Sequence, residues 1–236
     1  SSDNILVHRS QNVVIDGYEL KGWYNDGWVN CGVGAGGSVT STDPWVRNVV
    51  VKNCDMHQLY NAFRALPYYT GMDSLQLYNC NVWDIDEDGV YIQRCDNVII
   101  EGCHIWNVNL AWWRGATSPG DGIQLTDVCR NWLVKDNIID RRSTANKFAF
   151  IYGSAYYNPE GRGRFIGNTV YSPKDTIGDQ GGCGIYVQNG GYVEIAYNKF
   201  IGRGYYPGGH GQSAMFLAMD TVDFYYNIGD STGDGG

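Results

Sequence analysis

The hydrophobic residues recur in one pattern along the whole chain. Two apolar residues separated by one position are followed, three residues later, by a small or polar residue, and another apolar residue stands two positions beyond it. An alternation of period two predicts short β-strands with one buried face, and the residue between them predicts a corner without a hairpin. The corner position is occupied in turn by Tyr18, Cys54, Cys80, Cys103, Asn137, Asn168, Asn198 and Asn227.

A third strand precedes this unit in most repeats. Three short strands per repeat, stacked at about 4.8 Å, predict an all-β, single-domain parallel β-helix, or solenoid, of about eight coils over residues 1–236. A β-sandwich is the alternative, and the scarcity of hairpin signals disfavours it. The third strands are predicted at Val90–Gln93, Ile123–Thr126, Phe150–Tyr152 and Ile185–Gln188.

The corner column carries its own prediction. Identical side chains stacked at strand spacing form ladders, so we expect the four Asn amides to bond to one another and the three Cys side chains to pack as small apolar groups. Seven Cys without Cys/His metal spacing make a zinc site unfavourable. Cys95 and Cys129 each lie three residues before the first apolar position of their unit, which predicts neighbours on adjacent coils, either disulfide-bonded or reduced.

Composition limits the partners. No stretch of eighteen apolar residues occurs, so we expect no membrane span. The net charge of −8 and pI of about 4.8 disfavour nucleic acid and anionic membranes. Eighteen Tyr and eight Trp exceed what a core needs, and such residues are typical of sugar-binding surfaces. The chain starts at Ser1 without a leader, which we interpret as a mature or trimmed segment of a larger protein.

Two carboxylates are the leading catalytic candidates. Alignment of the coils on their corners places Asp88 and Asp121 at the same entry to successive strands. Two carboxylates one coil apart repel each other unless one is protonated or a cation lies between them. When one is protonated, it can act as the acid while the other acts as base or nucleophile. The alternative is that each Asp only caps a turn before Gly. Neighbouring outward positions predict a polar, aromatic strip for a sugar chain, made of Tyr91, Gln93, Gln124, Thr126, Tyr186 and Gln188.

An acidic segment raises the question of a metal. Asp84, Asp86 and Asp88 match the spacing of the first three ligands of a calcium-binding loop. Calcium is therefore the one cofactor to consider, and otherwise the sequence requires none. The second half of the loop fails, because Cys95 stands where Glu is needed. The alternative is a solvated acidic turn.

Three longer connections between strands predict that binding residues gather along one edge of the solenoid. They are Gly22–Thr42, Asn107–Gly120 and Arg141–Lys147. A base with a cation suits β-elimination, which makes His210 and the group Arg141, Arg142 and Lys147 further candidates. The second connection contains Trp112, Trp113 and Arg114, which either form a stacking wall for sugar or pack on their own coil.

The repeated NVxIxxCxI units, with DGVYIQ and GDGIQL strands, resemble the right-handed parallel β-helix superfamily of pectate lyases and polygalacturonases. The resemblance implies an extracellular or cell-surface location and a polysaccharide substrate on the outer face of the first strands. The step Gly209–Gly211 is similar to a polygalacturonase motif, but that family's paired aspartates and Arg-x-Lys are absent at the required places.

The segments NCNVWDIDEDGVYI, DRRSTANKFAFIYGS and GYVEIAYNKFIGRGY also resemble the archaeal, methanosarcinal disaggregatases. The sequence thus predicts an enzyme, a hydrolase or lyase, acting on an extended glycan that contains uronates or is neutral. The alternative is a non-catalytic β-helix that serves as a glycan-binding module, adhesin or fibre subunit. Open solenoid ends predict either flanking domains or end-to-end self-association.

Overall fold

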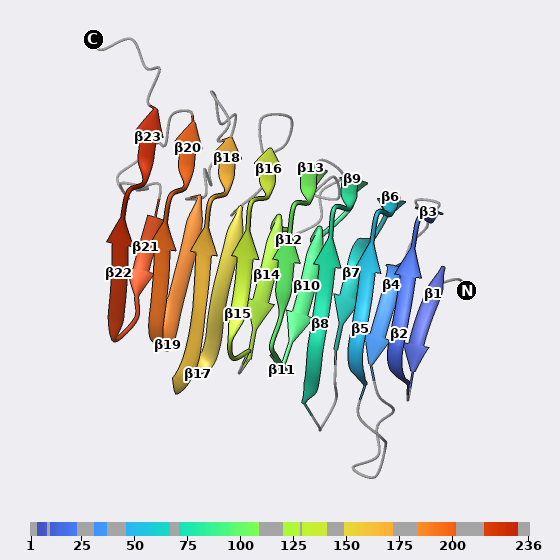
Figure 1. The fold of residues 1–236 in the computed structure, drawn as a ribbon, viewed down its shortest axis with the longest axis horizontal. Helices are drawn as coiled ribbons and strands as arrows, with labels where there is room; N and C mark the ends of the chain where they lie inside the picture. The colour runs from blue at the N-terminus through green and yellow to red at the C-terminus, as the bar shows by residue number, and fades with distance from the viewer. Residues whose placement is uncertain are drawn as a thin grey trace.

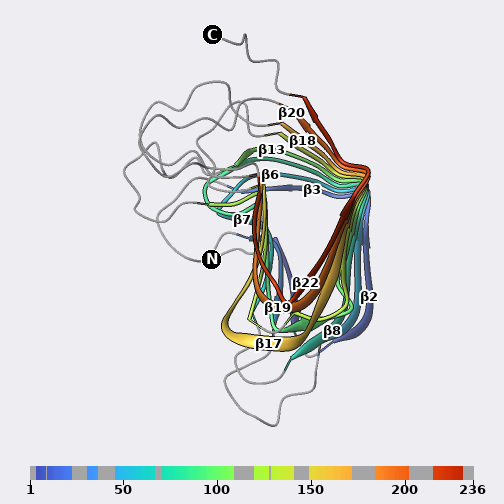
Figure 2. The same cartoon turned by 90° about the vertical axis from the view of Figure 1, so that its left-hand side faces the viewer.

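The computed structural model describes residues 4–8, 10–22, 31–36, 46–66, 71–108, 120–127, 129–140, 149–171, 184–201 and 215–230. The chain winds as a right-handed spiral of parallel strands, which lie side by side along its long axis (Figure 1). The end-on view shows three strand faces around one interior (Figure 2). Within the described ranges, no helix has the length and apolar character needed to cross a membrane. The predicted fold class is confirmed.

The first face carries the strand that opens each coil. Its strands pair in parallel in the order β1-β4-β7-β10-β14-β17-β19-β21. Their bounds are β1 (Ile5–His8), β4 (Cys31–Gly36), β7 (Asn61–Ala65), β10 (Val90–Gln93), β14 (Ile123–Thr126), β17 (Phe150–Ile166), β19 (Ile185–Ala196) and β21 (Met215–Ala218).

The second face continues each coil. Strands β17 and β19 are long because each runs from the first face into the second, and their mutual pairing shifts register on either side of Asn158, where the chain turns. The remaining strands are β2 (Gln11–Asp16), β5 (Arg47–Lys52), β8 (Met72–Tyr78), β11 (Cys95–Asp96), β12 (Ile99–Glu101), β15 (Trp132–Lys135) and β22 (Thr221–Tyr225).

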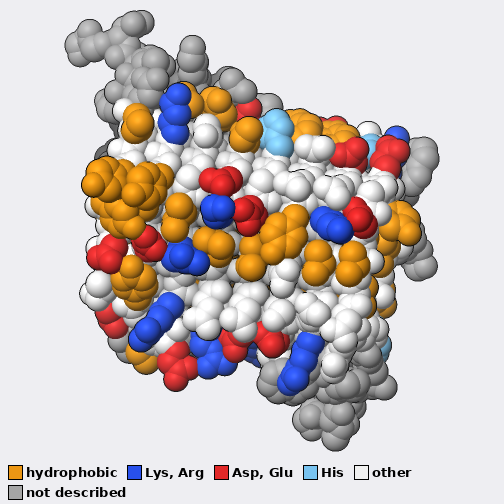
Figure 3. All heavy atoms as spheres, viewed as in Figure 1, with side chains coloured by type: hydrophobic (Ala, Val, Ile, Leu, Met, Phe, Trp, Pro, Cys, Tyr) orange, Lys and Arg blue, Asp and Glu red, His pale blue; other side chains and the backbone are white. Residues whose placement is uncertain are grey.

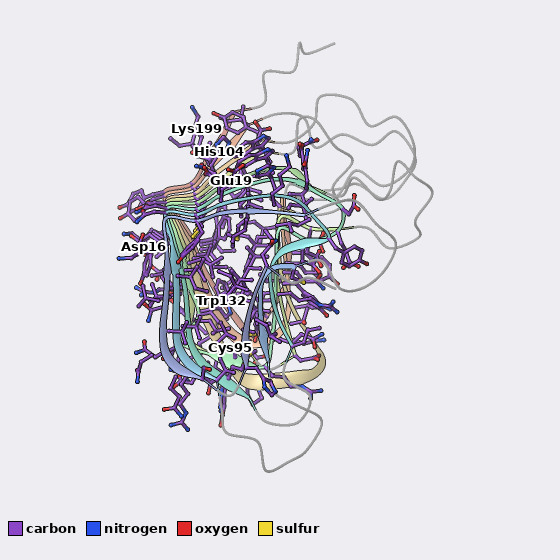
Figure 4. The ribbon with its side chains drawn as sticks, turned by 90° about the vertical axis from the view of Figure 1, so that its right-hand side faces the viewer. Asp16, Glu19, Cys95, His104, Trp132 and Lys199 are labelled. Carbon is purple, nitrogen blue, oxygen red and sulfur yellow. The ribbon has the colours of Figure 1, made fainter. Side chains whose placement is uncertain are left out.

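The third face is a separate eight-stranded sheet that follows the corner column. Its strands are β3 (Glu19–Lys21), β6 (Asp55–Leu59), β9 (Asn81–Ile85), β13 (His104–Val108), β16 (Ile138–Asp140), β18 (Thr169–Tyr171), β20 (Lys199–Ile201) and β23 (Ile228–Asp230). Figure 4 shows His104, Glu19 and Lys199 on this side of the molecule, whereas Trp132 and Cys95 lie inside the coil.

The Asn ladder is confirmed at the corner between the second and third faces. Asn137 donates its backbone N–H and its Nδ2 to Oδ1 of Asn168, both over 3.0 Å. In the same way, the backbone N–H and Nδ2 of Asn168 donate to Oδ1 of Asn198 over 2.8 and 3.1 Å. The same two groups of Asn198 donate to Oδ1 of Asn227 over 3.0 and 2.9 Å. The first three of these amides are at most 1% exposed, so the ladder satisfies groups that water does not reach.

The residue before each corner has a left-handed backbone, with φ between 51° and 74°. This conformation lets the chain change face within two residues, and Gly, Asn and Asp tolerate it best. The column comprises Gly17, Asn53, Asn79, Gly102, Asp136, Gly167, Tyr197 and Tyr226.

Gly163 interrupts the apolar column for a steric reason. It pairs with Trp132 on the neighbouring strand, and a Cβ added to Gly163 would lie 1.9 Å from Cε2 of that indole. The Trp132 ring fills the space of two side chains and packs against Phe150 and Tyr152.

One sequence-based expectation needs correction, and one open alternative is resolved. The connection Gly22–Thr42 is not all insertion, since β4 lies within it; the glycine-rich strand Cys31–Gly36 has too few large side chains to show the apolar pattern. Cys95 and Cys129 are free thiols, both fully buried, so the reduced alternative describes the structure. Burial raises the pKa of Cys129 to about 12.

Candidate functional site

Asp88 and Asp121 lie next to each other before two neighbouring strands. β10 and β14 pair with Val90 opposite Ile123, which places the residues preceding each strand on adjacent coils. The backbone N–H of Asp121 donates to Oδ1 of Asp88 over 2.7 Å. Both side chains are nearly buried, at 3% and 4% exposure. The predicted proximity of the two residues is therefore confirmed.

Glycine makes this close approach feasible. A Cβ on Gly89, which follows Asp88, would lie 2.6 Å from the carbonyl oxygen of Gly122, and one on Gly120, which precedes Asp121, would lie 2.1 Å from the carbonyl oxygen of Glu87. Any larger side chain would force the two coils apart, because real Cβ contacts are not this short. The Asp-Gly steps thus set the spacing of the two carboxyl groups.

The surroundings of Asp88 favour its neutral form. Burial raises the pKa of Asp88 well above its usual value, and the negative charge of Asp121 raises it further. The hydrogen bond from the Asp121 backbone and the positive charge of Arg64 act in the opposite direction but are weaker. Within this pair, burial and the neighbouring Asp121 carboxyl group therefore both raise the pKa of Asp88.

Gln124 covers the Asp88 carboxyl group. With its amide nitrogen turned toward Asp88, Gln124 donates to Oδ1 over 3.3 Å and to Oδ2 over 3.2 Å. With its amide oxygen in that place, Gln124 accepts a hydrogen bond from the O–H group of the neutral acid. Gln124 is therefore a partner of the acid as well as a member of the predicted strip.

The predicted strip forms on the first face. Tyr91, Gln124 and Tyr186 share one outward register column, with Ile151 between the last two. Gln93, Thr126 and Gln188 share the next column, and all six polar side chains are half-buried.

Hydrogen bonds within single strands hold this strip in place. Gln93 donates to the Tyr91 hydroxyl group, and the Tyr186 hydroxyl group donates to Gln188 Oε1 over 2.6 Å. Burial raises the pKa of Tyr91, so its phenol keeps its proton near neutral pH. The strip therefore presents neutral polar groups in fixed orientations, which suits hydrogen bonds to the hydroxyl groups of a sugar.

The structure adds residues that the sequence reasoning missed. Arg64 lies in register with Tyr91, one coil earlier in the same outward column. Asn61 is fully buried in the Asp88 column and donates to the Asp88 carbonyl oxygen over 3.2 Å. Burial and the charge of Glu87 raise the pKa of Tyr60. The signal was available in the segment NAFRA, which aligns residue by residue with DGVYI of the next coil, with Asn in place of Asp and Ala in place of Gly.

The acidic segment does not converge on a metal. No group of three His, Cys, Asp or Glu side chains suited to a metal ion occurs among the described residues, which include Asp84, Asp86 and Asp88. Asp84 accepts a hydrogen bond from Asn107 on the next coil, while Asp88 is buried. Asp84 lies in β9 (Asn81–Ile85), whereas Asp86 and Asp88 lie in the bend that follows it, so the three carboxylates do not share one strand face.

Other predicted site residues lie outside the described residues. They are Trp112, Trp113, Arg114, Arg141, Arg142, Lys147 and His210.

Comparison with known proteins defines the class. A family model described as the right-handed β-helix region matches residues 1–170, so the chain belongs to that family. Its fold is also similar to a solved mutant of the periplasmic alginate epimerase AlgG, with a TM-score of 0.52 and 13% sequence identity. The match covers 95% of this chain and 47% of that one, so the chain spans about half the length of the epimerase structure. No curated protein matches the sequence significantly.

Proposed function

We propose that this chain is a polysaccharide-modifying enzyme that uses Asp88 as its acid and Asp121 as its base. The glycan lies across the outer surface of β7, β10, β14 and β19, along the strip of Tyr91, Gln124 and Tyr186. The observation that carries the proposal is the adjacency of Asp88 and Asp121, joined by a hydrogen bond of 2.7 Å, with Gln124 of the strip within 3.3 Å of the Asp88 carboxyl group; burial raises the pKa of Asp88 in the direction that an acid needs. The structural neighbour is named as an alginate epimerase, which supports a polysaccharide as substrate.

Two acids at one site suit glycoside hydrolysis. Asp88 gives its proton to the glycosidic oxygen, and the Asp121 carboxylate accepts a proton from the attacking water. Arg64 on the same outward column favours a uronate-containing glycan, and with such a substrate the same acid and base serve β-elimination. We place the enzyme outside the cell or at its surface, where such a polymer is found.

A second candidate is a glycan-binding solenoid without catalysis. The near-complete burial of Asp88 and Asp121 favours it, because a hydrogen-bonded ladder of entry residues has a structural use on its own. In that case the strip binds sugar and the acids only fix the coil spacing.

The test uses neutral, pectic and glycosaminoglycan-like polymers, with and without added calcium. Hydrolysis yields new reducing ends, elimination yields the ultraviolet absorbance of an unsaturated uronate, and epimerisation changes the sugar NMR spectrum without chain cleavage. We expect Asp88→Asn and Asp121→Asn each to lower turnover at least ~100-fold, with folding intact. Asp55→Asn on the third face is the control and keeps full turnover. Polymer binding without any of the three products establishes the second candidate, and unchanged turnover in both site variants refutes the assignment of the acids.

A further inference from the structure

A cluster of exposed tyrosines lies at the corner between the second and third faces, away from the first face. Tyr197 and Tyr226 stack with ring centroids 5.2 Å apart and planes 21° apart, and Tyr225 meets both rings edge-on. The exposed fractions of Tyr197, Tyr225 and Tyr226 are 58%, 36% and 73%. Figure 3 shows a large gathering of hydrophobic side chains at this edge of the molecule, beside β22 and β23. We call these three residues the tyrosine corner.

The backbone of the tyrosine corner is unfavourable for its residues. Tyr197 and Tyr226 have φ of 58° and 52°, in the column where six other coils carry Gly, Asn or Asp. The left-handed conformation costs a bulky L-residue about 1–2 kcal/mol. Two successive coils therefore retain an aromatic ring at a position where a smaller residue would be more stable, which is typical of a functional site.

The polar atoms around the rings are acceptors. The Tyr225 hydroxyl group donates to Glu194, and the Tyr192 hydroxyl group donates to Asp223 Oδ2 over 2.8 Å. These hydrogen bonds to carboxylates raise the pKa of both tyrosines to about 12, so the phenols remain donors to the protein. A ligand must therefore supply its own hydrogen-bond donors to the remaining carboxylate lone pairs.

Charge excludes one class of sugar. Glu194 and Asp223 lie opposite each other on β19 and β22, and Arg164 on β17 is in register with Glu194 on its other side. One cation against two carboxylates makes this part of the second face acidic, and Lys199 adds a cation on the third-face side of the corner. The net charge of −8 of the whole chain disfavours uronates and sulfated sugars. A neutral pyranose has an apolar C–H face for an aromatic ring and hydroxyl donors for the carboxylates.

We propose that the tyrosine corner is a second glycan-binding surface, specific for uncharged pyranose chains and separate from the acid pair on the first face. It binds by stacking of sugar rings on Tyr197 and Tyr226 and by hydroxyl donation to Glu194 and Asp223. This surface works whether or not the first face is catalytic, because it shares no residue with that site.

The test is a titration followed by the ring signals of the tyrosines in NMR spectra. The probes are cellohexaose and maltohexaose as neutral chains and a guluronate hexasaccharide as the acidic one. We expect saturable shifts of Tyr197 and Tyr226 with at least one neutral chain and none with the acidic chain. Tyr197→Asn and Tyr226→Asn are expected to weaken binding about tenfold, the equivalent of one stacking contact. Both variants fold, because Asn already occupies this backbone position in other coils.

Two control variants distinguish binding at the tyrosine corner from binding by other exposed tyrosines and from binding at the first face. Tyr18→Ala removes a tyrosine that is 55% exposed at the first corner and leaves binding unchanged. Asp88→Asn also leaves binding at the tyrosine corner unchanged, so failure of the proposed function does not affect the result. The proposal is overturned by absence of shifts with both neutral chains, by equal binding of guluronate, or by full affinity in the Tyr197 and Tyr226 variants. Tyrosine shifts that depend on protein concentration without sugar also overturn it, because they identify a contact between copies of the chain.

Discussion

Replacement of Asn168 by Ala tests how far the corner ladder stabilises the solenoid. The Asn168 side chain is fully buried and accepts two hydrogen bonds from Asn137, through its backbone N–H and its Nδ2, both over 3.0 Å. Its own Nδ2 donates to the carbonyl oxygen of Val134 over 2.9 Å. Alanine deletes the acceptor of both Asn137 groups. Each buried donor left without a partner costs about 1–3 kcal/mol, so we expect a loss of about 2–6 kcal/mol in the free energy of unfolding.

Urea unfolding followed by circular dichroism measures this loss, with the dependence on urea checked for an unchanged slope. Asn227→Ala is the matched control. It removes the same two bonds from Asn198, but Asn227 is partly exposed, so water replaces the lost acceptor and the expected cost is about 1 kcal/mol. A loss below 1 kcal/mol for Asn168→Ala, or equal losses in the two variants, would refute the reasoning.

Two further predictions concern ionisation and packing. The raised pKa of Asp88 means that the folded chain binds this proton more tightly than the unfolded chain, so its contribution to stability is full below the unfolded pKa and is lost as pH rises through the folded pKa. In urea unfolding, the stability of Asp88→Asn relative to the unsubstituted chain therefore rises as pH increases above the usual Asp pKa of 3.8. Asp16→Asn is the contrast: hydrogen bonds from Asn53 and Lys52 lower the pKa of Asp16, so its contribution to stability is present above 3.8 and is lost as pH falls below that value. A pH-independent difference for Asp88→Asn contradicts this account. Gly163→Val is expected to yield no soluble folded chain, because the Trp132 ring occupies the position of the new side chain; a folded variant with native thermal stability would show that the ring moves at little cost.

The sequence predicted the parts of this fold that depend on local periodicity. Alternation in units such as Val49, Val51, Cys54 and Met56 fixes which residues face inward, and the repeat length fixes which residues become neighbours on adjacent coils. The Asn ladder followed from the same alignment, because an amide is both donor and acceptor and bonds to its own copy.

The parts that were missed depend on more than periodicity. β4 was hidden because glycine gives no apolar signal. The burial of Asp88 was not considered, because Asp88 precedes β10 and the alternation of that strand does not extend to it. The contact of Gln124 with that carboxyl group depends on a side-chain torsion, which the spacing of residues does not determine.

The ladder also has a direction. In each of its three steps the amide of the earlier coil donates and Oδ1 of the later coil accepts, so the C=O groups of these side chains all point toward the N-terminal coils. Aligned dipoles polarise one another, and each bond in such a chain is strengthened by roughly 10–30%. The corner therefore carries a row of parallel amide dipoles along the long axis. The charge distribution of one coil depends on its neighbours as well as on its own sequence.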